Sequence, residues 1–331
     1  MEPTTPDEAA ELFLEKRRGD SARSTVQSYQ YRLKQWLEWC SENDIEAVEE
    51  LTTLHIHKFN TYLNDRIAKT TKKSYMTALR LLLDYMCKLN ITSRELVEAV
   101  ETPTLSGDDD VRSDILTQEE AEEVLEHLKR FEYASRTHIQ LLLAWRVGAR
   151  MSSIRALDLS DYDSEEQFLQ FRDRADEGTS LKNGGGGERM VALSPDTCTV
   201  IDSYIEQNRI DVEDKHGRKP LLTTRQGRIS KNCMRRRTYQ YTRPCERGET
   251  CPHERDPEDC EAMSPTTAHA CPSSVALHAI RRGAITTMLS DDDTPTRAVS
   301  DRVDASKEVL DKHYDSRSEK SKMEKRRQFF S

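Results

Sequence analysis

Four separated side chains carry the groups that transfer of a phosphodiester needs. Arg150 stands in VGARMSSIRALDLSDYD, and Tyr314 stands in EVLDKHYDS near the end of the chain. His278 and Arg281 lie three positions apart in LHAIRRG, hence on one face of a helix. Guanidinium groups bind phosphate oxygens bidentately, and a tyrosine hydroxyl, with a normal pKa of about 10, becomes a nucleophile where a base or cationic field favours its ionisation. Together they predict phosphoryl transfer, with Arg150 and Arg281 as a phosphate clamp and Tyr314 as the nucleophile.

Taken singly, each of these signals has an ordinary structural interpretation. An arginine at a helix end is usually a solvated surface group, and H-x-x-R occurs by chance in many proteins. A tyrosine near a C-terminus is usually a packing aromatic. The order and spacing of the set, with Lys182 in a glycine-rich stretch between its members, are what favour a shared site.

The chain from residue 115 onward is predicted to be a mostly helical domain with one small antiparallel sheet. TQEE at 117–120 is a capping-box pattern before a helix that ends near Phe131, and the strongly apolar IQLLLAWRVGAR follows. QFLQFRD and RMVALS read as strands, and the Lys-Asn and four glycines at 182–187 between them predict the tip of a hairpin. Apolar spacing predicts further helices at SPDTCTVIDSYIEQNR, SKNCMRRRTYQY, SSVALHAIRRGAITTMLS and KEVLDKHYD.

Residues 1–102 are predicted to form a bundle of short helices. Apolar residues recur at helical spacing in STVQSYQYRLKQWLEWCSEND, and Thr52 or Thr53 is expected to cap LHIHKFNTYLNDRIA. Thr70 or Thr71 is expected to cap KKSYMTALRLLLDYMCKLN, and a short helix at SRELVEAV closes the unit. Residues 103–114 have no periodicity and carry Pro, Gly and an acidic run, which predicts a linker between two domains.

The ordered set R…K…H-x-x-R…Y behind a helical domain resembles the tyrosine recombinase (phage integrase) family over essentially the whole chain. GARMSSI matches the family's G-x-R-x-S-E-L box, HAIR matches H-x-L-R, and Tyr314 matches the terminal tyrosine. The resemblance implies a mainly α fold, with a helical core-binding (SAM-like) domain at 1–102 and a catalytic domain at 115–331. It also implies a site-specific recombinase or integrase that forms a 3′-phosphotyrosyl intermediate without metal or ATP, with Lys182 as general acid. The implied catalytic residues are Arg150, Lys182, His278, Arg281 and Tyr314.

Two positions depart from the family pattern. Arg282 stands where the family usually has His, and D-A-S at 304–306 aligns with G-H-S, so that Ala305 replaces the usual His or Trp. His313 is at most a partial substitute, because neighbours on a helix point in different directions. Two alternatives therefore stay open: a DNA-binding regulator of the same fold with impaired catalysis, and a type IB topoisomerase, which shares the Arg/Lys/Arg/Tyr chemistry.

Basic residues concentrate in two segments that we expect to contact the phosphates of double-stranded DNA. The stretch 225–247 is rich in arginine and is unbalanced by acids until Glu246. In the N-terminal domain, Thr-Lys-Lys at a helix start offers hydroxyls and free backbone N–H groups to phosphate. The predicted DNA-contacting residues are Lys69, Lys72, Lys73, Arg80, Arg235, Arg236 and Arg237.

The segment 245–271 is a cysteine-rich insertion with almost no apolar residues, so it cannot form a hydrophobic core of its own. Three interpretations are open for its cysteines: a structural zinc site, reduced free thiols, or disulfides, which the cytosol disfavours. A zinc ion with four protein ligands would be structural rather than catalytic, with His253 as a possible replacement ligand. The candidate zinc ligands are Cys245, Cys251, Cys260 and Cys271.

The composition is polar but globular, with 35% hydrophobic and 33% charged residues among 331. No run of about 18 apolar residues occurs, and the start of the chain lacks a signal-peptide pattern, so we expect a cytoplasmic protein. The net charge of −9 argues at first against a nucleic-acid partner, but many acids with few lysines are typical of proteins adapted to strong salt. We therefore expect a haloarchaeal-type variant. The charged tail after Tyr314 either packs on a neighbouring protomer of a dimer or tetramer on DNA, or is disordered.

Overall fold

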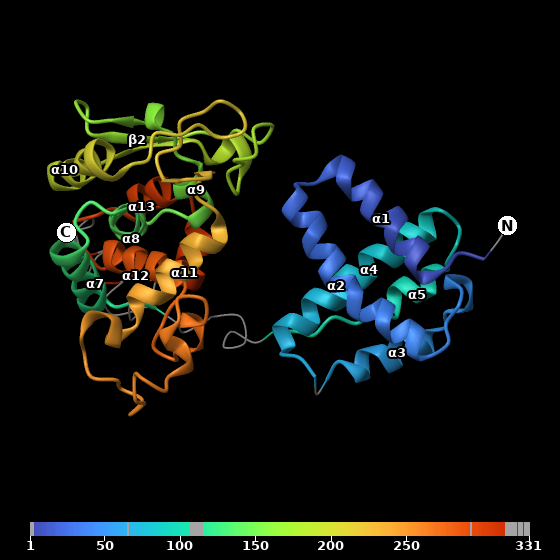
Figure 1. The fold of residues 1–331 in the computed structure, drawn as a ribbon. Coiled ribbons are helices and arrows are strands. Elements are labelled where there is room, and N and C mark those ends of the chain that lie inside the picture. Colours follow the sequence, from blue (N-terminus) through green and yellow to red (C-terminus); the bar gives the residue numbers. More distant parts are fainter. Residues whose placement is uncertain are drawn as a thin grey trace. The chain divides into compact units, whose positions relative to one another are not determined.

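The computed structural model describes residues 3–64, 66–105, 115–291 and 293–314, together with Met323 and Arg327. The chain divides into two compact units, unit 1 (Met1–Arg112) and unit 2 (Ser113–Ser331), each described by itself (Figure 1). The division falls inside the expected linker 103–114, of which residues 106–114 lie outside the described part of the chain. The tail with Phe329-Phe330 lies outside it as well.

Unit 1 is a bundle of α-helices, as its apolar spacing predicts. Its described elements are α1 (Pro6–Asp20), α2 (Arg23–Glu42), the 3₁₀ turn η1 (Val48–Glu50), α3 (Thr53–Tyr62), α4 (Lys69–Lys88) and α5 (Arg94–Glu98). Thr52 caps α3 through its side chain, as expected. The expectation of a cap at Thr70 or Thr71 is wrong, because α4 begins at Lys69 and its first turn already contains both threonines.

The core of unit 1 is built around large aromatic side chains. Phe13, Trp36 and Phe59 are fully buried, and the rings of Trp36 and Phe59 meet edge to face with centroids 5.0 Å apart. Burying each such side chain stabilises the fold by roughly 2–3 kcal/mol. Leu79 and Leu83 from α4 complete this core. Unit 1 therefore has an apolar core independent of the one in unit 2.

Unit 2 is mostly helical, with small antiparallel sheets. Its described helices are α7 (Gln118–Phe131), α8 (Arg136–Arg146), α9 (Met151–Ala156), α10 (Pro195–Ser203), α11 (Lys231–Thr242), α12 (Leu277–Ser290), α13 (Thr296–Val303) and α14 (Lys307–His313), and its strands are β1 (Tyr162–Asp163), β2 (Phe168–Phe171), β3 (Arg189–Ala192), β4 (Thr223–Thr224) and β5 (Gly227–Arg228). The capping box at the start of α7 is confirmed: Thr117 accepts from the Glu120 backbone N–H, and the Glu120 carboxylate accepts from the Thr117 N–H at 2.8 Å. Helix α13 has no counterpart among the predicted elements.

The two strands of the predicted hairpin pair with each other, but its tip is not at 182–187 as expected. An antiparallel bridge between Arg174 and Thr179 closes the turn at 175–178, and the glycines form the 3₁₀ helix η3 (Gly184–Gly187). Strands β1, β2 and β3 form one antiparallel sheet, in which Leu169 of β2 pairs with Val191 of β3, and β4 and β5 form a second small sheet. Leu169 and Val191 are buried, whereas the segment between the two strands carries Lys182 and the glycines. The hairpin thus holds Lys182 in the connection between two paired strands.

Helix α8 lies at the centre of unit 2, among α7, α11 and α12 (Figure 1). Every residue from Thr137 to Trp145 is buried, which is typical of a helix that is covered on all sides. Gln140 donates to the Met234 carbonyl at 2.9 Å and to the Thr238 hydroxyl at 2.8 Å, which satisfies its amide and ties α8 to α11. This central helix leads directly to Arg150, the first of the predicted site residues.

A smaller apolar cluster joins the last three helices. Ile285 and Leu289 of α12 pack with Val303 of α13, and Leu310 and Tyr314 at α14 complete the cluster. Its members are buried, so the chain after α12 is anchored to that helix by apolar contacts. The cluster therefore holds Tyr314 against the helix that carries His278 and Arg281.

Candidate active site

Arg150 is the N-cap of α9, directly after the break that follows α8. Gly148 makes this break possible: it has a φ of +65°, and a Cβ there would lie 3.0 Å from the Val303 side chain. Arg150 is partly exposed, and its Nη1 meets the Asp304 Oδ2 at 2.5 Å. Its Nη2 donates to the Asp304 carbonyl at 2.7 Å. Two nitrogens of the guanidinium are thereby held by one residue.

Arg281 is held by backbone carbonyls. It is 1% exposed, and it donates from Nη1 to the Gly148 carbonyl at 2.5 Å and from Nη2 to the Val303 carbonyl at 2.8 Å. Its Nε has no hydrogen-bond partner among the described residues. Burial lowers the pKa of Arg281, and the positive charge of Arg150 lowers it further. Both effects disfavour the charged guanidinium, so an anion bound beside Arg281 would stabilise it.

Arg150, His278 and Arg281 lie together at one hollow of about 300 Å³. The sequence-predicted clamp is therefore brought together, with His278 beside it on α12. Lys231 and Arg235, from the first turns of α11, line the same hollow. Sequence reasoning predicted Arg235 as a DNA contact but did not connect it or Lys231 with Arg150, because their nearness to Arg150 depends on how α11 packs against α9 and α12.

Tyr314 closes α14, and its side chain is 8% exposed. Its backbone carbonyl accepts from the Thr286 hydroxyl of α12 at 3.1 Å. Burial lowers the pKa of Arg281, and the electrostatic interaction with the nearby Tyr314 side chain opposes that shift. The structure therefore brings the predicted nucleophile to the predicted clamp. The side chain of His313 lies outside the described residues.

Lys182 is exposed and does not line this hollow. Its neighbour Asn183 donates to the Asp304 Oδ1 at 2.8 Å, so the hairpin is linked to the site through the same carboxylate that meets Arg150. Arg189, at the start of β3, is a further buried guanidinium in this region, stacked over the Phe171 ring at 4.2 Å. Burial lowers the pKa of Arg189 to about 10, and Asp304 opposes that shift. Sequence reasoning missed both roles: it considered Asp304 only as the first residue of the D-A-S segment aligned with G-H-S, and Arg189 stands in none of the matched motifs.

The predicted DNA contacts divide into exposed and buried groups. Lys69, Arg235 and Arg236 are exposed, and Lys73 and Arg237 are half-buried. Arg80 is exposed, and its guanidinium donates a hydrogen bond to the Val100 carbonyl.

The expectation for Lys72 is wrong, because this side chain is 8% exposed and its ammonium donates to Asn64. Burial lowers the pKa of Lys72. The basic segment 225–247 also loses members to internal ion pairs: Arg228 pairs with Asp214 at 2.8 Å, and Arg243 pairs with Glu246 at 2.5 Å. Neither arginine is available to a phosphate.

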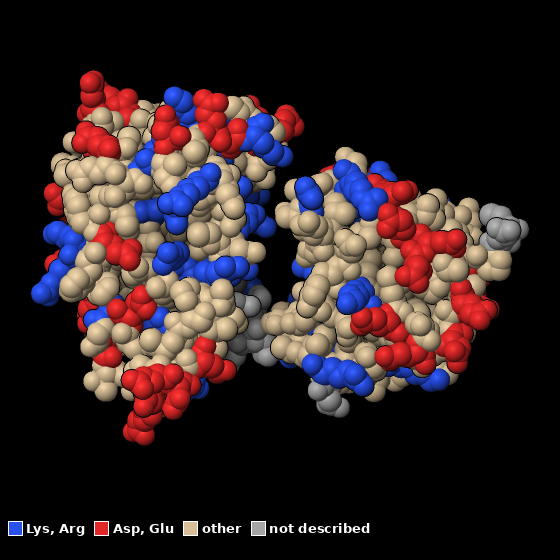
Figure 2. Space-filling view, in the orientation of Figure 1, with Lys and Arg blue, Asp and Glu red and all other residues tan. Residues whose placement is uncertain are grey.

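The surface of unit 2 has a basic region and an acidic region. Figure 2 shows Lys and Arg side chains across the middle of this face, around α9 and α11. It also shows acidic side chains gathered at the lower tip, where the segment 245–271 lies. Acids such as Glu254, Glu258 and Asp259 belong to that segment and are exposed. The tip is therefore unsuited to contact a phosphate backbone.

The zinc site expected in this segment is not supported. The part of the chain that the structure describes contains all eight cysteines, and each is a free thiol. Within that part no group of three or more His, Cys, Asp or Glu side chains is arranged to hold a metal ion. His253 instead shares a hydrogen bond of 2.8 Å with the Ser273 hydroxyl. The segment is ordered by short turns and by Arg243, which donates to the Ala262 carbonyl.

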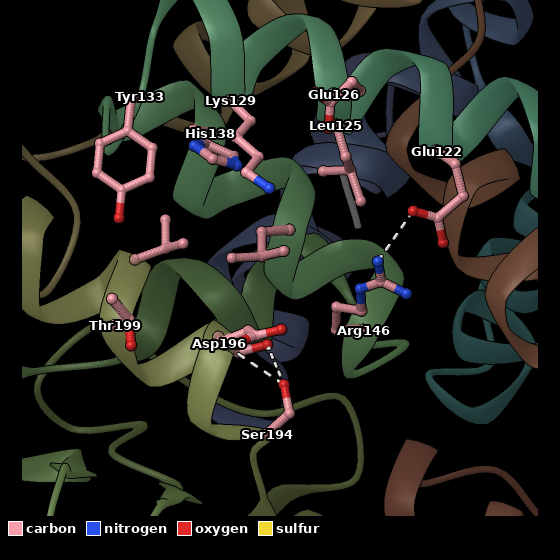
Figure 3. Close-up of a pocket in the computed structure, with 13 residues that line it drawn as sticks. Glu122, Leu125, Glu126, Lys129, Tyr133, His138, Arg146, Ser194, Asp196 and Thr199 are labelled. Carbon is pink, nitrogen blue, oxygen red and sulfur yellow. Dashed lines mark hydrogen bonds and ion pairs between the residues drawn. The ribbon is translucent and has the colours of Figure 1, made fainter.

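A larger hollow of about 730 Å³ lies on another part of unit 2, among α7, α8 and α10 (Figure 3). Glu122 and Arg146 form an ion pair of 2.9 Å at one end, and Tyr133 and Thr199 line the other (Figure 3). None of the clamp residues lines it. Because its polar side chains show no convergent acid–base or nucleophilic set, the smaller hollow at Arg150 is the better candidate for chemistry.

The known proteins that this chain resembles in sequence are described as integrases or recombinases. Residues 10–97 match the family model described as "Phage integrase, N-terminal SAM-like domain". The tyrosine recombinase XerD of Oceanobacillus iheyensis is 26% identical over 216 residues, which cover 65% of this chain and 68% of that protein. A probable integrase/recombinase protein of Methanocaldococcus jannaschii is 25% identical over 203 residues, covering 59% of this chain and 58% of that protein.

The fold of the whole chain is also found among solved structures. The crystal structure of a lambda integrase dimer bound to a COC′ core site matches with a TM-score of 0.61 and 11% sequence identity. The match covers 98% of this chain and 77% of that chain. At this identity the likeness concerns the fold: a SAM-like helical domain followed by a mostly helical domain with small antiparallel sheets. Among the described helices, none has both the length and the apolar character needed to cross a membrane.

Proposed function

We propose that this chain is a member of the tyrosine recombinase (phage integrase) family and acts as a site-specific recombinase that cuts and rejoins DNA strands through Tyr314. The observation that carries the proposal is the convergence of Arg150, His278 and Arg281 on one hollow, with Tyr314 packed against α12, the helix that carries His278 and Arg281. A scissile phosphate in that hollow would meet guanidinium groups on one side and the nucleophile on the other.

The proposed reaction exchanges one phosphodiester for another. The Tyr314 hydroxyl gives up its proton, for which His278 is the proposed acceptor, and its oxygen attacks phosphorus. The bond from phosphorus to the 5′ oxygen breaks, and a 3′-phosphotyrosyl linkage forms. Arg150 and Arg281 stabilise the charge that builds on the non-bridging oxygens. The released 5′ oxygen takes up a proton, for which Lys182 is the proposed donor and His278 a supporting group. A 5′ hydroxyl of a second strand then attacks the linkage, and because bond energy is conserved no ATP is required.

Lys182 has to move for this role. It is exposed, and the connection that carries it contains Gly185 and Gly186, where a Cβ would meet nothing within 4 Å. The open space around these glycines allows this connection to change conformation at low cost. We therefore propose that the hairpin brings Lys182 to the leaving oxygen once DNA is bound.

The proposed assembly is a dimer or tetramer on double-stranded DNA. The lambda integrase structure of similar fold contains a dimer bound to its core site. The acidic composition, with a net charge of −9, supports a haloarchaeal-type variant that works in strong salt. The exposed Lys69, Arg235 and Arg236 and the half-buried Lys73 would then contact DNA phosphates in addition to the clamp.

A covalent-adduct assay tests the proposal. We expect wild-type protein to become covalently attached to the 3′ end of a nicked suicide duplex that contains its recombination site, and Tyr314→Phe to bind the same duplex without any adduct. The adduct is measured as a shifted band on denaturing gels. Absence of an adduct for wild type in low and high salt would instead support a DNA-binding regulator, which the buried Ala305 in place of the usual His favours. Relaxation of any supercoiled plasmid, without site preference, would favour a topoisomerase.

A further inference from the structure

Asp304 contacts both the clamp and the hairpin from the turn between α13 and α14. Its carboxylate oxygen Oδ2 lies 2.5 Å from Arg150 Nη1, and Oδ1 accepts from the Asn183 amide at 2.8 Å. Its backbone carbonyl accepts from Arg150 Nη2 at 2.7 Å. The Asp304 side chain is 10% exposed, so solvent screens these contacts little. One residue thus binds two segments that lie more than a hundred positions away in the chain.

The backbone around Asp304 is shaped for this contact. Asp304 ends α13 in the left-handed conformation, with φ +54° and ψ +59°, which Asp adopts more readily than most residues. The hairpin reaches the carboxylate at Gly187, where a Cβ would lie only 3.2 Å from the Asp304 Oδ2. The close approach therefore depends on a small residue on one side and on an αL-tolerant acid on the other.

Charge balance at the site also depends on this carboxylate. Arg150, Arg189 and Arg281 all lie within electrostatic range of one another, and Asp304 is the acid that opposes their mutual repulsion. The motif G-x-R-x-S-E-L would place a Glu three residues after Arg150, but this chain has the uncharged, buried Ser153 there. The carboxylate that meets Arg150 comes from a distant turn instead.

We propose that Asp304 is a positioning residue for strand cleavage: it fixes the orientation of Arg150 and holds the Lys182 hairpin to the clamp. This inference rests on the proposed function. A guanidinium gripped along its Nη edge keeps its Nε–H and the outer N–H groups for the phosphate, in one orientation. Misplacement of such a group by about 1 Å is enough to reduce a rate by about 100-fold.

The test compares variants that differ in which contact they remove. Asp304→Gly removes the carboxylate without straining a backbone whose φ is positive, and Asp304→Asn removes only the charge. Asn183→Ala releases the hairpin but leaves the Arg150 contact. Asp301→Asn is the matched control, because Asp301 is an exposed acid on the same helix that meets Arg297 only at 4.0 Å.

Each variant is assayed for the single-turnover rate of adduct formation on the suicide duplex and, with Tyr314→Phe added, for affinity for the same duplex. We expect both Asp304 variants to lower the rate by about tenfold or more, with affinity within about threefold of wild type, since misorientation affects the transition state more than binding. Asn183→Ala should lower the rate less, and Asp301→Asn should match wild type.

Equal or faster adduct formation in both Asp304 variants overturns the proposal, because the carboxylate would then compete with the phosphate for Arg150. A rate loss that parallels loss of folded protein, followed by circular dichroism at the assay temperature, also overturns it. If wild type itself forms no adduct, the proposed function fails together with this role. A wild-type adduct with unaffected Asp304 variants removes only the positioning role.

Discussion

Buried charged and titratable side chains in unit 2 are held by specific partners rather than by the solvent. Arg281 donates to two backbone carbonyls, and Arg228 pairs with Asp214 in a site from which water is largely excluded. Such groups are expensive to leave unpaired, so their partners must form together with the fold. An arginine can contact DNA only if it is exposed and not fully held by internal partners. Arg150, whose guanidinium is partly exposed, meets the first condition.

His138 makes the stability of unit 2 depend on pH. It is 2% exposed, its Nδ1 accepts from the Ala134 N–H at 3.2 Å, and burial lowers its pKa from 6.5 to about 4. The neutral ring is favoured in the folded state, so the associated stability is present above pH 6.5 and is lost as the pH falls toward 4. We expect the loss to approach about 3 kcal/mol, measured by urea denaturation at pH 7.5 and 4.5.

The control for this prediction is His138→Asn, whose amide oxygen can still accept from Ala134. We expect this variant to be less stable at every pH but to have a flatter dependence between pH 6.5 and 4.5. An unchanged slope would show that another group causes the pH dependence.

At the scale of elements, helix packing decides where the site residues meet. Helix α12 packs closely on α8 at Gly283, where a Cβ would lie 2.9 Å from the Trp145 ring. Arg281 and His278 lie on the same helix before this point, Arg281 within one turn of it. The crossing also sets the distance from Arg281 to the Gly148 carbonyl at the end of α8. Close packing of these two helices is therefore a condition for the clamp.

Gly283→Ala tests this condition. A Cβ at Gly283 would lie 1.9 Å from the Leu116 carbonyl oxygen, just before α7, and 2.9 Å from the Trp145 ring of α8, so α12 must move away from both neighbours. We expect a loss of at least about 1–3 kcal/mol in the free energy of unfolding, together with reduced adduct formation, because overpacking displaces backbone. Gly185→Ala is the control, since nothing lies within 4 Å of its Cβ position. Equal stability of the two variants would contradict the packing argument.

At the scale of the whole molecule, a net charge of −9 coexists with a local basic surface. In unit 2, acidic side chains gather at the lower tip, on the segment 245–271, and also along the upper edge, whereas Lys and Arg lie across the middle of the face (Figure 2). Internal ion pairs such as those of Arg228 and Arg243 further separate total charge from surface charge. The overall balance is therefore a poor guide to DNA affinity, and salt dependence is the more direct measure.

The salt dependence of DNA binding tests the proposed surface on α11. We expect Arg235→Gln with Arg236→Gln, two exposed positions, to reduce the slope of log K against log salt by about 2, since each phosphate contact contributes about 0.9. Binding is measured by fluorescence anisotropy in the Tyr314→Phe background. Arg130→Gln, at an exposed arginine of α7, should leave the slope unchanged. The same slope in the double variant would place the DNA contacts elsewhere.

Local sequence signals predicted a large part of the structure. The capping box at Thr117, the two strands that flank Lys182 and the amphipathic helices of unit 1 follow from short-range patterns that act within a few residues. The same signals failed at Thr70, where the helix begins earlier than the apolar face suggests, and for Lys72, which the packing of unit 1 buries.

By itself the sequence determined the order and types of Arg150, His278, Arg281 and Tyr314, and hence the kind of chemistry available. Tertiary structure alone decided that Asp304 meets Arg150 and that the four cysteines of 245–271 do not form a metal cluster. The reason is physical: such contacts join residues far apart in the chain, and which of many possible pairs forms depends on how whole helices pack. Local propensity specifies the helices, but only their packing brings the carboxylate to the clamp.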